Sequence, residues 1–370
     1  MGLKVHKLKL QDWRSFKEKE LIFSPRVTVL VGPNAVGKTN TIEALQLLTA
    51  GFSFRKPTPA QLIKQDTDSA QIAAELTGGG RFIDVVCQVK GNRRSFFTNN
   101  KACKAGDMPR SLMSILFNPD DLSLVKGSAR LRRDELDNFG KQAAVGYANL
   151  FSAYQRTVEQ RNRLLKDTYP DFSLLDAWDA SLALGGAALL DARLRMFQRL
   201  TNKMIPIYEQ ISDGEELSCH YISSLSQKDD DDLELGKLTR NELVDKLTLA
   251  LQQSRVDDLR RQQTLIGPHR DDVLFEINGR SARNFGSQGQ QRSVVLAWKM
   301  AEVEVAKEIV GSTPLLLLDD VMSELDEKRR LAVVNFVQKD IQTVVTTTNL
   351  GYFNDELLEQ AEVIHFEPQL

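Results

Sequence analysis

The chain has 370 residues, of which 42% are hydrophobic and 26% are charged. At about 150 residues per domain this length indicates two or three domains, and the composition is that of a soluble globular protein. The formal net charge is -2 and the isoelectric point is about 6.2, which excludes a wholly basic DNA-binding module. Any surface for nucleic acid must therefore be a local patch.

The sequence carries no signal for export or membrane insertion. The three cysteines, Cys87, Cys103 and Cys219, are far apart and odd in number, which favours a reducing interior over a disulfide framework. The N-terminus MGLKVHKLKL lacks the apolar core of a signal peptide, and no apolar run approaches the roughly 20 residues that span a bilayer. We expect a cytoplasmic protein, or a soluble subunit docked on another protein, with no membrane partner.

The spacing of apolar residues predicts strands at both ends of the chain and helices in the middle. Residues 1–31 alternate and then form a buried run, and 70–103 contains three runs separated by the turn signals TGGG and KGNR. From residue 147 the apolar positions follow helical spacing on both sides of a turn at Pro170, which predicts two long antiparallel helices. The predicted helices are 38–50, 147–165, 175–211, 240–263 and 288–310, and the later strands are 272–279, 314–318 and 343–348.

This order of elements predicts one discontinuous α/β domain that carries a helical insertion. Residues 1–125 and 264–370 would form the α/β domain. Residues 126–263 would form the inserted helical lobe.

The stretch GPNAVGKT, residues 32–39, fits the phosphate-loop pattern G-x-x-x-x-G-K-[ST] completely. Such a loop surrounds the β-phosphate of a nucleotide with backbone N–H groups, and glycine permits the close approach. Lys38 supplies charge to the phosphates, Thr39 ligates Mg²⁺, and the following helix points its positive end at the phosphates. We predict ATP and Mg²⁺ as cofactors, with a nucleotide-binding loop formed by Gly32, Pro33, Asn34, Ala35, Val36, Gly37, Lys38, Thr39 and Asn40.

A carboxylate for the metal follows the apolar run PLLLL, residues 314–318. Asp319 would hold Mg²⁺ through its water shell, and Asp320 would orient or deprotonate the attacking water. Two adjacent acids after a strand could instead cap a helix. The matched phosphate loop favours the nucleotide site.

A second turn, FGSQGQQRS at 285–293, opens a predicted helix and so offers another anion site. One nucleotide does not need two such sites from one subunit. We therefore expect Ser287 and Gly289 to face the γ-phosphate of a nucleotide held by a second copy, so that two subunits enclose two ATP molecules as a twofold homodimer. An ordinary helix cap is the alternative.

These motifs, in this order, resemble the ABC-type ATPases, whose signature reads close to Ser-Gly-Gly-Gln. Within them, the chain is identified as a member of the RecF family, which is related to the SMC-type heads. The resemblance covers nearly the whole chain. It rests on GPNAVGKTNTIEAL, SFR (53–55), FNPDDLSLVKGSA (117–129), RRDELD (132–137), GPHRDD (267–272), FGSQGQQRS and LLLLDDVMSELD.

The resemblance implies an α/β ABC-type ATPase head, lobe I, with an inserted helical lobe II that contains a long antiparallel helix pair. It implies a weak Mg-dependent ATPase that dimerises on ATP and binds double-stranded DNA and single-/double-strand junctions. Members of the family act as recombination mediators, loading the strand-exchange recombinase at gaps together with the RecO and RecR proteins.

Residue roles are carried over from the matching motifs. Lys38 and Asp320 would be catalytic, and Arg55 resembles the ATP-binding arginine that follows the phosphate-loop helix in SMC-type heads. Asn118 lies near the usual Q-loop glutamine and joins Thr39 and Asp319 as a candidate Mg²⁺ ligand. The signature in trans would be Ser287, Gln288, Gly289 and Gln290, and the D-loop at the dimer seam would include Ser323 and Asp326. His269 and Arg270 match a family motif whose chemistry the sequence does not reveal.

Two features depart from the usual ABC pattern. Asp319 corresponds to the Walker B aspartate of these ATPases, most of which have Glu at the next position. This chain has Asp320 there, and its shorter side chain is consistent with slow turnover. Transporter ATPases also carry a switch histidine after the next strand, and here Thr347 or Thr348 is the nearest candidate.

Two segments are locally basic. Residues 126–166 and 81–110 each have a net charge of +5, which suits salt-sensitive, sequence-independent contact with DNA phosphates. Ordinary solvated faces are the alternative. The predicted DNA contacts are Arg93, Arg94, Arg130, Arg132 and Arg133.

Two other functions are alternatives to that of an ATP-driven recombination mediator. A transporter's nucleotide-binding subunit would need a membrane partner, for which the sequence gives no support. An ATP-dependent structural clamp would use hydrolysis only to reset itself.

Overall fold

The computed structural model describes residues 2–212, 214–225, 235–338 and 340–367, and the chain divides into two compact units. Unit 1 comprises Met1–Ser123 and Val295–Leu370, and unit 2 comprises Leu124–Val294. The first boundary lies close to the expected one. The second lies at 294 and not at 263, because strand β10 (Asp272–Ile277) pairs with β9 (Leu217–Ile222) inside unit 2.

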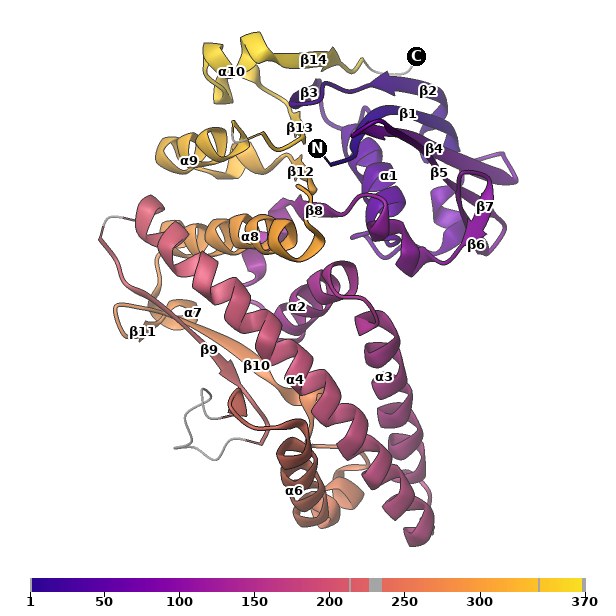
Figure 1. Ribbon diagram of the computed structural model, residues 1–370, viewed down its shortest axis with the longest axis vertical. Coiled ribbons are helices and arrows are strands. Elements are labelled where there is room, and N and C mark those ends of the chain that lie inside the picture. The colour runs from indigo at the N-terminus through magenta and orange to yellow at the C-terminus, as the bar shows by residue number, and fades with distance from the viewer. Residues whose placement is uncertain (1, 213, 226–234, 339, 368–370) are drawn as a thin grey trace. The chain divides into compact units, whose positions relative to one another are not determined.

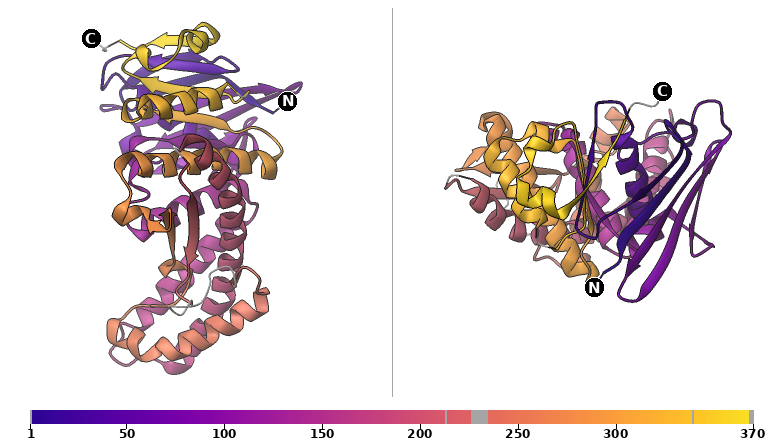
Figure 2. Two further views of the ribbon diagram at one scale, coloured as in Figure 1. Left: turned by 90° about the vertical axis from the view of Figure 1, so that its left-hand side faces the viewer. Right: turned by 90° about the horizontal axis from the view of Figure 1, so that it is seen from above.

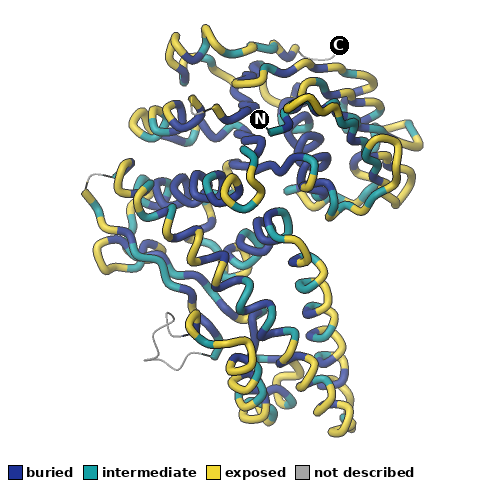
Figure 3. The backbone as a smooth tube through the Cα atoms, in the orientation of Figure 1, coloured by how far each residue is buried: buried dark blue, intermediate teal, exposed yellow. Residues whose placement is uncertain are grey.

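In unit 1, helix α1 (Lys38–Ala50) lies between two sheets (Figure 1). One sheet is antiparallel in the order β2-β1-β4-β5-β6-β7, and the other is parallel in the order β14-β3-β13-β12-β8. Almost every residue of α1 is buried because both of its sides are covered (Figure 3). The strands are β1 Lys4–Trp13, β2 Phe16–Ile22, β3 Val27–Val31, β4 Ser69–Gly78, β5 Arg81–Lys90, β6 Arg93–Thr98, β7 Lys101–Cys103, β8 Ser114–Phe117, β12 Leu315–Asp319, β13 Thr343–Thr347 and β14 Ala361–His365.

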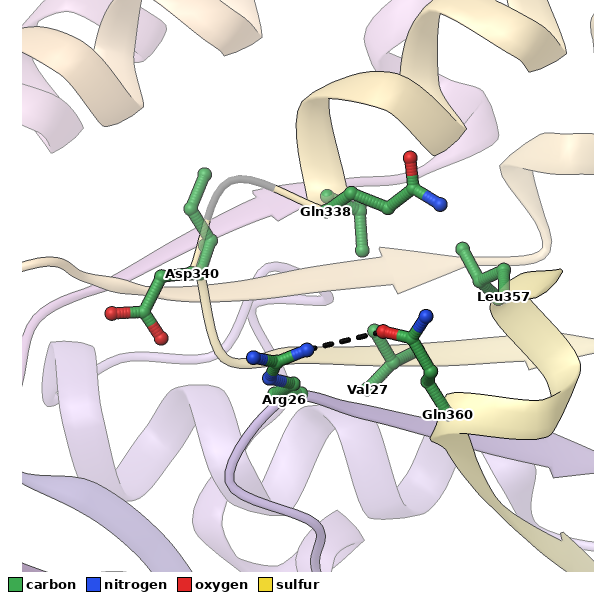
Figure 4. Close-up of a pocket in the computed structure, with 8 residues that line it drawn as sticks. Arg26, Val27, Gln338, Asp340, Leu357 and Gln360 are labelled. Atoms are coloured by element: carbon green, nitrogen blue, oxygen red, sulfur yellow. Dashed lines mark hydrogen bonds between the residues drawn. The ribbon is translucent and has the colours of Figure 1, made fainter.

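The parallel sheet explains the apolar runs in the sequence. All residues of β3 (VTVLV) and β12 (LLLLD) are buried, because helices α9 (Glu327–Val337) and α10 (Asp355–Gln360) cover the face opposite α1 (Figure 1). Near β3, Arg26 donates a hydrogen bond to Gln360 Oε1 at 3.1 Å and lines a hollow of about 20 Å³ (Figure 4). That volume suits a single water molecule and no larger ligand.

Unit 2 is built on long helices. Helices α3 (Tyr147–Leu164) and α4 (Phe172–Ile211) pack side by side, and α6 (Arg240–Arg261) also packs on α4 (Figure 2). The predicted helix pair is therefore confirmed. The 40 residues of α4 extend about 60 Å, and Asp171 caps its start by accepting from the N–H groups of Ser173 and Leu174.

The remaining elements of unit 2 are shorter than these three helices. Within the described residues they are α2 (Ala129–Ala143), the 3₁₀ turn η4 (Pro268–Arg270), α7 (Ala282–Phe285) and a sheet of order β11-β10-β9, with β11 at Arg280–Ser281. Helix α8 (Gln288–Val310) begins in unit 2 and continues into unit 1. Among the described residues, no helix is long and apolar enough to cross a bilayer.

Buried ion pairs hold the helices of unit 2 together. Arg193 on α4 donates to both carboxylate oxygens of Asp137 on α2, at 2.8 and 2.7 Å, and to the carbonyl of Pro268 at 2.5 Å. Arg161 on α3 donates to Asp179 at 2.5 Å and to Asp258 at 2.7 Å. These side chains are almost wholly buried, so each charge depends on its partner for the interactions that water would otherwise give.

We predict that Arg193→Met lowers the free energy of unfolding by about 3–5 kcal/mol, because it leaves the Asp137 carboxylate buried without its counter-charge. Arg199→Met, at an exposed position on the same helix, should change it by less than about 0.5 kcal/mol. Urea unfolding followed by circular dichroism measures both. Equal losses in the two variants would contradict the role given to the Arg193–Asp137 pair.

Candidate functional site

The phosphate loop joins β3 to α1 and requires glycine at both ends. Gly37 has φ 100°, and a Cβ there would lie 2.3 Å from the Phe16 ring. A Cβ on Gly32 would lie 2.3 Å from the carbonyl oxygen of Phe366. Ala35 also has positive φ, at 66°. The backbone is therefore held in a tight curve that side chains at 32 and 37 would break.

Lys38 turns back into this curve. Its Nζ donates to the carbonyl oxygens of Gly32 and Pro33, each at 2.7 Å. Burial lowers the pKa of Lys38, while the nearby carboxylates of Asp320 and Asp319 act to raise it. The ammonium group is thus fixed beside the loop, in the position where a phosphate chain would need a counter-charge.

Asp319 connects the loop helix to the parallel sheet. The hydroxyl of Thr39, on α1, donates to Asp319 Oδ1 at 2.9 Å, and the hydroxyl of Thr346, on β13, donates to the same oxygen at 2.7 Å. Burial raises the pKa of Asp319, and the two hydroxyl hydrogen bonds oppose that shift. Asp319 pairs with Thr346 in the β12–β13 register, which explains why their side chains meet.

Asp320 lies just beyond the strand in a left-handed conformation, with φ 52°. Its N–H donates to Thr346 Oγ1 at 2.9 Å, and its side chain makes no capping hydrogen bond to the following 3₁₀ turn η5 (Val321–Glu324). The helix-cap alternative for this aspartate therefore does not describe its geometry. Oδ1 is buried without a hydrogen-bond partner among the described residues, and burial raises the pKa of the carboxyl.

Arg55 is held near the loop helix by a buried carboxylate that sequence reasoning missed. Glu43, fully buried on α1, accepts two hydrogen bonds from Arg14, at 2.9 and 2.7 Å, and lies 3.5 Å from Arg55. Arg55 also donates to Asn40 Oδ1 at 2.9 Å, and the indole of Trp13 donates to the Asn40 carbonyl at 3.0 Å. Glu43 could have been recognised in the sequence as a charged residue among the apolar positions of α1.

Asn118 follows β8, the strand beside β12. Its Oδ1 accepts from the N–H groups of Asp120 and Asp121, at 2.8 and 3.2 Å, and so begins the 3₁₀ turn η3 (Pro119–Ser123). This oxygen is engaged by the backbone, and its assignment to the metal stays a prediction. No cluster of three or more His, Cys, Asp or Glu suited to a metal occurs among the described residues. A Mg²⁺ ion bound mainly by phosphates and water does not need one.

The predicted signature turn lies in unit 2 and opens α8. Ser287 N–H donates to Gln290 Oε1 at 2.7 Å, and Gln290 N–H donates to Ser287 Oγ at 3.2 Å, which is a capping box. The helix-cap alternative thus describes the hydrogen bonds within the chain. The Ser287 hydroxyl proton still has no acceptor among the described residues, so capping leaves it able to donate to an anion.

The predicted D-loop connects Asp320 to α9. Ser323 Oγ donates to the carbonyl of Asp320 at 2.8 Å, and Asp326 caps α9 by accepting from the N–H of Arg329 at 3.0 Å. Ser323 is exposed. Both side chains therefore stabilise the turn that follows Asp320.

Known proteins resemble the chain over nearly its whole length. The family described as the RecF/RecN/SMC N-terminal domain matches residues 4–366. The Bacillus subtilis protein named DNA replication and repair protein RecF is 36% identical over 364 residues, which is 96% of each chain. The Heliobacterium modesticaldum protein of the same name is 35% identical, over 99% of this chain and 98% of the relative. The chain belongs to the RecF family.

Solved structures agree with this assignment. One described as the recombination mediator protein RecF-ATPrS in the RecFOR pathway has a TM-score of 0.87 and 29% identity, and covers 95% of this chain and 94% of its own. An SMC head bound to the C-winged helix domain of ScpA has a TM-score of 0.55 at 16% identity, which shows a shared fold alone. The predicted family and the predicted ABC-type ATPase head are thus confirmed.

In this RecF-family chain, the arginines proposed for DNA differ in exposure. Arg93 and Arg94 on β6 and Arg130 on α2 are exposed. The prediction for Arg132 is wrong, because its guanidinium is buried, pairs with Asp272 at 2.7 and 2.9 Å and donates to three backbone carbonyls. Arg133 is half-buried and donates to the carbonyl of Asp271 at 2.5 Å. Local net charge could not separate structural arginines from exposed ones.

The family motif GPHR has a structural role in unit 2. His269 Nδ1 lies 2.8 Å from the Tyr154 hydroxyl, and Nε2 lies 3.1 Å from the Thr264 carbonyl, to which Arg270 also donates at 2.9 Å. A neutral ring satisfies both contacts, with Nε2–H donating and Nδ1 accepting. Burial lowers the pKa of His269 to about 4, and the charges of Arg270 and Arg133 add to the shift.

We predict that the free energy of unfolding falls as the pH drops from about 6.5 to about 4, partly through His269. The folded chain holds this histidine neutral, whereas the unfolded chain binds a proton at the ordinary pKa, so acid favours unfolding. His269→Gln, which can keep both hydrogen bonds, should make the decline shallower by at most about 1.4 kcal/mol per pH unit.

Urea unfolding across this pH range measures the slope, with His365→Gln, at an exposed position, as the control. A His269→Gln slope equal to that of the parent would show that the ring titrates normally.

Proposed function

We propose that this protein is an ATP-dependent recombination mediator that acts in DNA repair and replication. ATP drives its dimerisation, the closed dimer holds double-stranded DNA, and slow hydrolysis resets it. The observation that carries the proposal is the group of Lys38, Thr39 and Asp319 at the phosphate loop, beside an Asp320 oxygen that has no hydrogen-bond partner in the described part of the chain. The relatives named for DNA replication and repair, and the RecF structures described with ATP and ATPrS, support it.

The loop residues have separate tasks in binding ATP. Residues 32–37 would direct backbone N–H groups at the phosphates, and Lys38 would exchange its carbonyl partners for phosphate oxygens. Thr39 and Asp319 would hold Mg²⁺, which neutralises phosphate charge when bound. Asp320 Oδ1 would orient the attacking water and accept its proton, a task for which an oxygen without a competing hydrogen bond is suited.

The signature turn supports the proposed dimer. Ser287 of one copy would donate its hydroxyl proton to the γ-phosphate held by the other, while its oxygen continues to cap α8. Gln288, Gly289 and Gln290 would complete that contact. Ser323 and Asp326, in the turn after Asp320, would lie at the seam between copies.

The DNA contact would be electrostatic. Arg93, Arg94 and Arg130 are the exposed members of the predicted set, and their contact with phosphates would be sequence-independent and weakened by salt. Double-stranded DNA and single-/double-strand junctions are the proposed substrates. RecR, acting with RecO, is the proposed partner for loading recombinase at gaps, in the cytoplasm.

We predict that Lys38→Met abolishes ATP binding, ATP-driven dimerisation and DNA retention, because the phosphates lose their buried counter-charge. Asp320→Asn should keep the dimer and its DNA while slowing hydrolysis at least about 10²-fold, within the range for loss of a general base. Sedimentation with ATP and a 30-base-pair duplex, together with phosphate release, measures these outcomes. Hydrolysis by Asp320→Asn at the parent rate would show that this carboxylate is not the base.

We predict that Ser287→Arg leaves ATP binding to the monomer intact but blocks dimerisation, because a long cation replaces the small donor at the shared phosphate. Ser152→Arg, at an exposed position on α3, is the matched control and should dimerise like the parent. Nucleotide titration and sedimentation with ATP decide the matter. An unchanged dimer in Ser287→Arg would contradict the trans assignment.

A further inference from the structure

The side chain of Gln290 is held from two sides. Its Oε1 accepts the N–H of Ser287 at 2.7 Å, and its Nε2 donates to Glu215 Oε1 at 2.6 Å. The second oxygen of Glu215 accepts from the hydroxyl of Tyr208 at 2.6 Å. One carboxylate therefore connects the first turn of α8 to Tyr208, a fully buried residue in the last turn of α4.

The carboxylate determines which way the Gln290 amide points. An amide has one accepting end and one donating end, whereas a carboxylate only accepts. In the reversed orientation, Nε2 would face the Ser287 N–H, donor against donor, and Oε1 would face the negative charge of Glu215. Glu215 thus favours the one orientation that closes the turn around Ser287.

Among the described residues, no side chain other than Glu215 forms a hydrogen bond with the Gln290 amide. A hollow of about 360 Å³ borders the turn, lined by Ile277, Asn278, Arg280, Phe285, Gly286 and Gln290. Gln290 is only half-buried, so without Glu215 water could take over its amide protons. The Ser287 N–H, and with it the capping geometry of Ser287, would then lose a fixed acceptor.

We propose that Glu215 is a positioning residue for the signature turn. It fixes the Gln290 amide, which fixes Ser287 in the geometry needed to reach the γ-phosphate of a second copy. The inference rests on the proposed function, because it requires an ATP-driven dimer. Through Tyr208, the same carboxylate makes the geometry of the signature turn depend on the end of α4.

The test compares Glu215→Ala with Glu216→Ala in the full-length chain, using sedimentation with ATPγS and titration of the monomer with a fluorescent ATP analogue. Glu216 is the next residue, it is exposed, and its side chain has no partner among the described residues. Glu216→Ala therefore removes the same charge without removing a contact. We expect Glu215→Ala to weaken dimerisation about 10- to 100-fold, as for a lost hydrogen bond to a charged group. Its monomer should bind nucleotide within twofold of the parent.

Further variants keep the test decisive. Tyr208→Phe, which removes the hydroxyl that donates to Glu215 but leaves Glu215 and Gln290 in contact, should weaken dimerisation less than Glu215→Ala. If Glu215→Ala does not fold, Glu215→Leu decides, because it keeps a similar size but offers no acceptor to the Gln290 amide. That variant should show the same weakening.

The outcomes separate this inference from the proposed function. Parent-like dimerisation by the Glu215 variants, or equal loss of dimerisation, monomer nucleotide affinity and thermal stability, would overturn the positioning role alone. A parent protein that stays monomeric with ATPγS would overturn the proposed function, and this inference with it.

Discussion

The hydrogen bonds of Thr39 and Thr346 to one oxygen of Asp319 are the contact on which the candidate site depends. They join α1, β12 and β13, which reach this point from distant parts of the sequence. Thr346 also accepts the N–H of Asp320, so one hydroxyl group holds both aspartates in place. Loss of the Thr346 hydroxyl would therefore remove a contact from both aspartates, whereas loss of the Thr39 hydroxyl would affect Asp319 alone. The strained backbone of Asp320, at φ 52°, is consistent with a site shaped by function.

The two units are stabilised by different means. In unit 1, a helix lies between two sheets and buries an apolar core that is continuous across them. In unit 2, long helices meet around Arg161 and Arg193, whose guanidinium groups are buried with their aspartates. Apolar contacts tolerate small shifts, but a buried bidentate pair fixes angle as well as distance. The helices of unit 2 are thus held in a specific register, at the cost of desolvating the charges.

Local pattern was sufficient for much of this structure. The strand, loop and helix around residues 32–39, the long helix pair and the strands β3, β12 and β13 carry their signal in adjacent residues, and the structure confirms each of them. The role of Glu43, the burial of Arg132 and the assignment of residues 264–294 to unit 2 were not predicted, because they are decided by partners far along the chain. Arg132 is buried by Asp272, and β10 joins unit 2 by pairing with β9. Strand β8 was also not predicted, because its four residues are too few to show a periodic pattern, although all of them are buried in the parallel sheet.

Helix α8 has a consequence for modularity. The boundary between the units, at 294 and 295, falls inside this helix and not in a loop. Cutting the gene there would leave the backbone groups of an interrupted helix without partners on both sides of the cut. Residues 124–294 therefore cannot be exchanged between relatives as a self-contained segment. A graft that respects the fold would have to keep α8 whole, together with the turn that starts it.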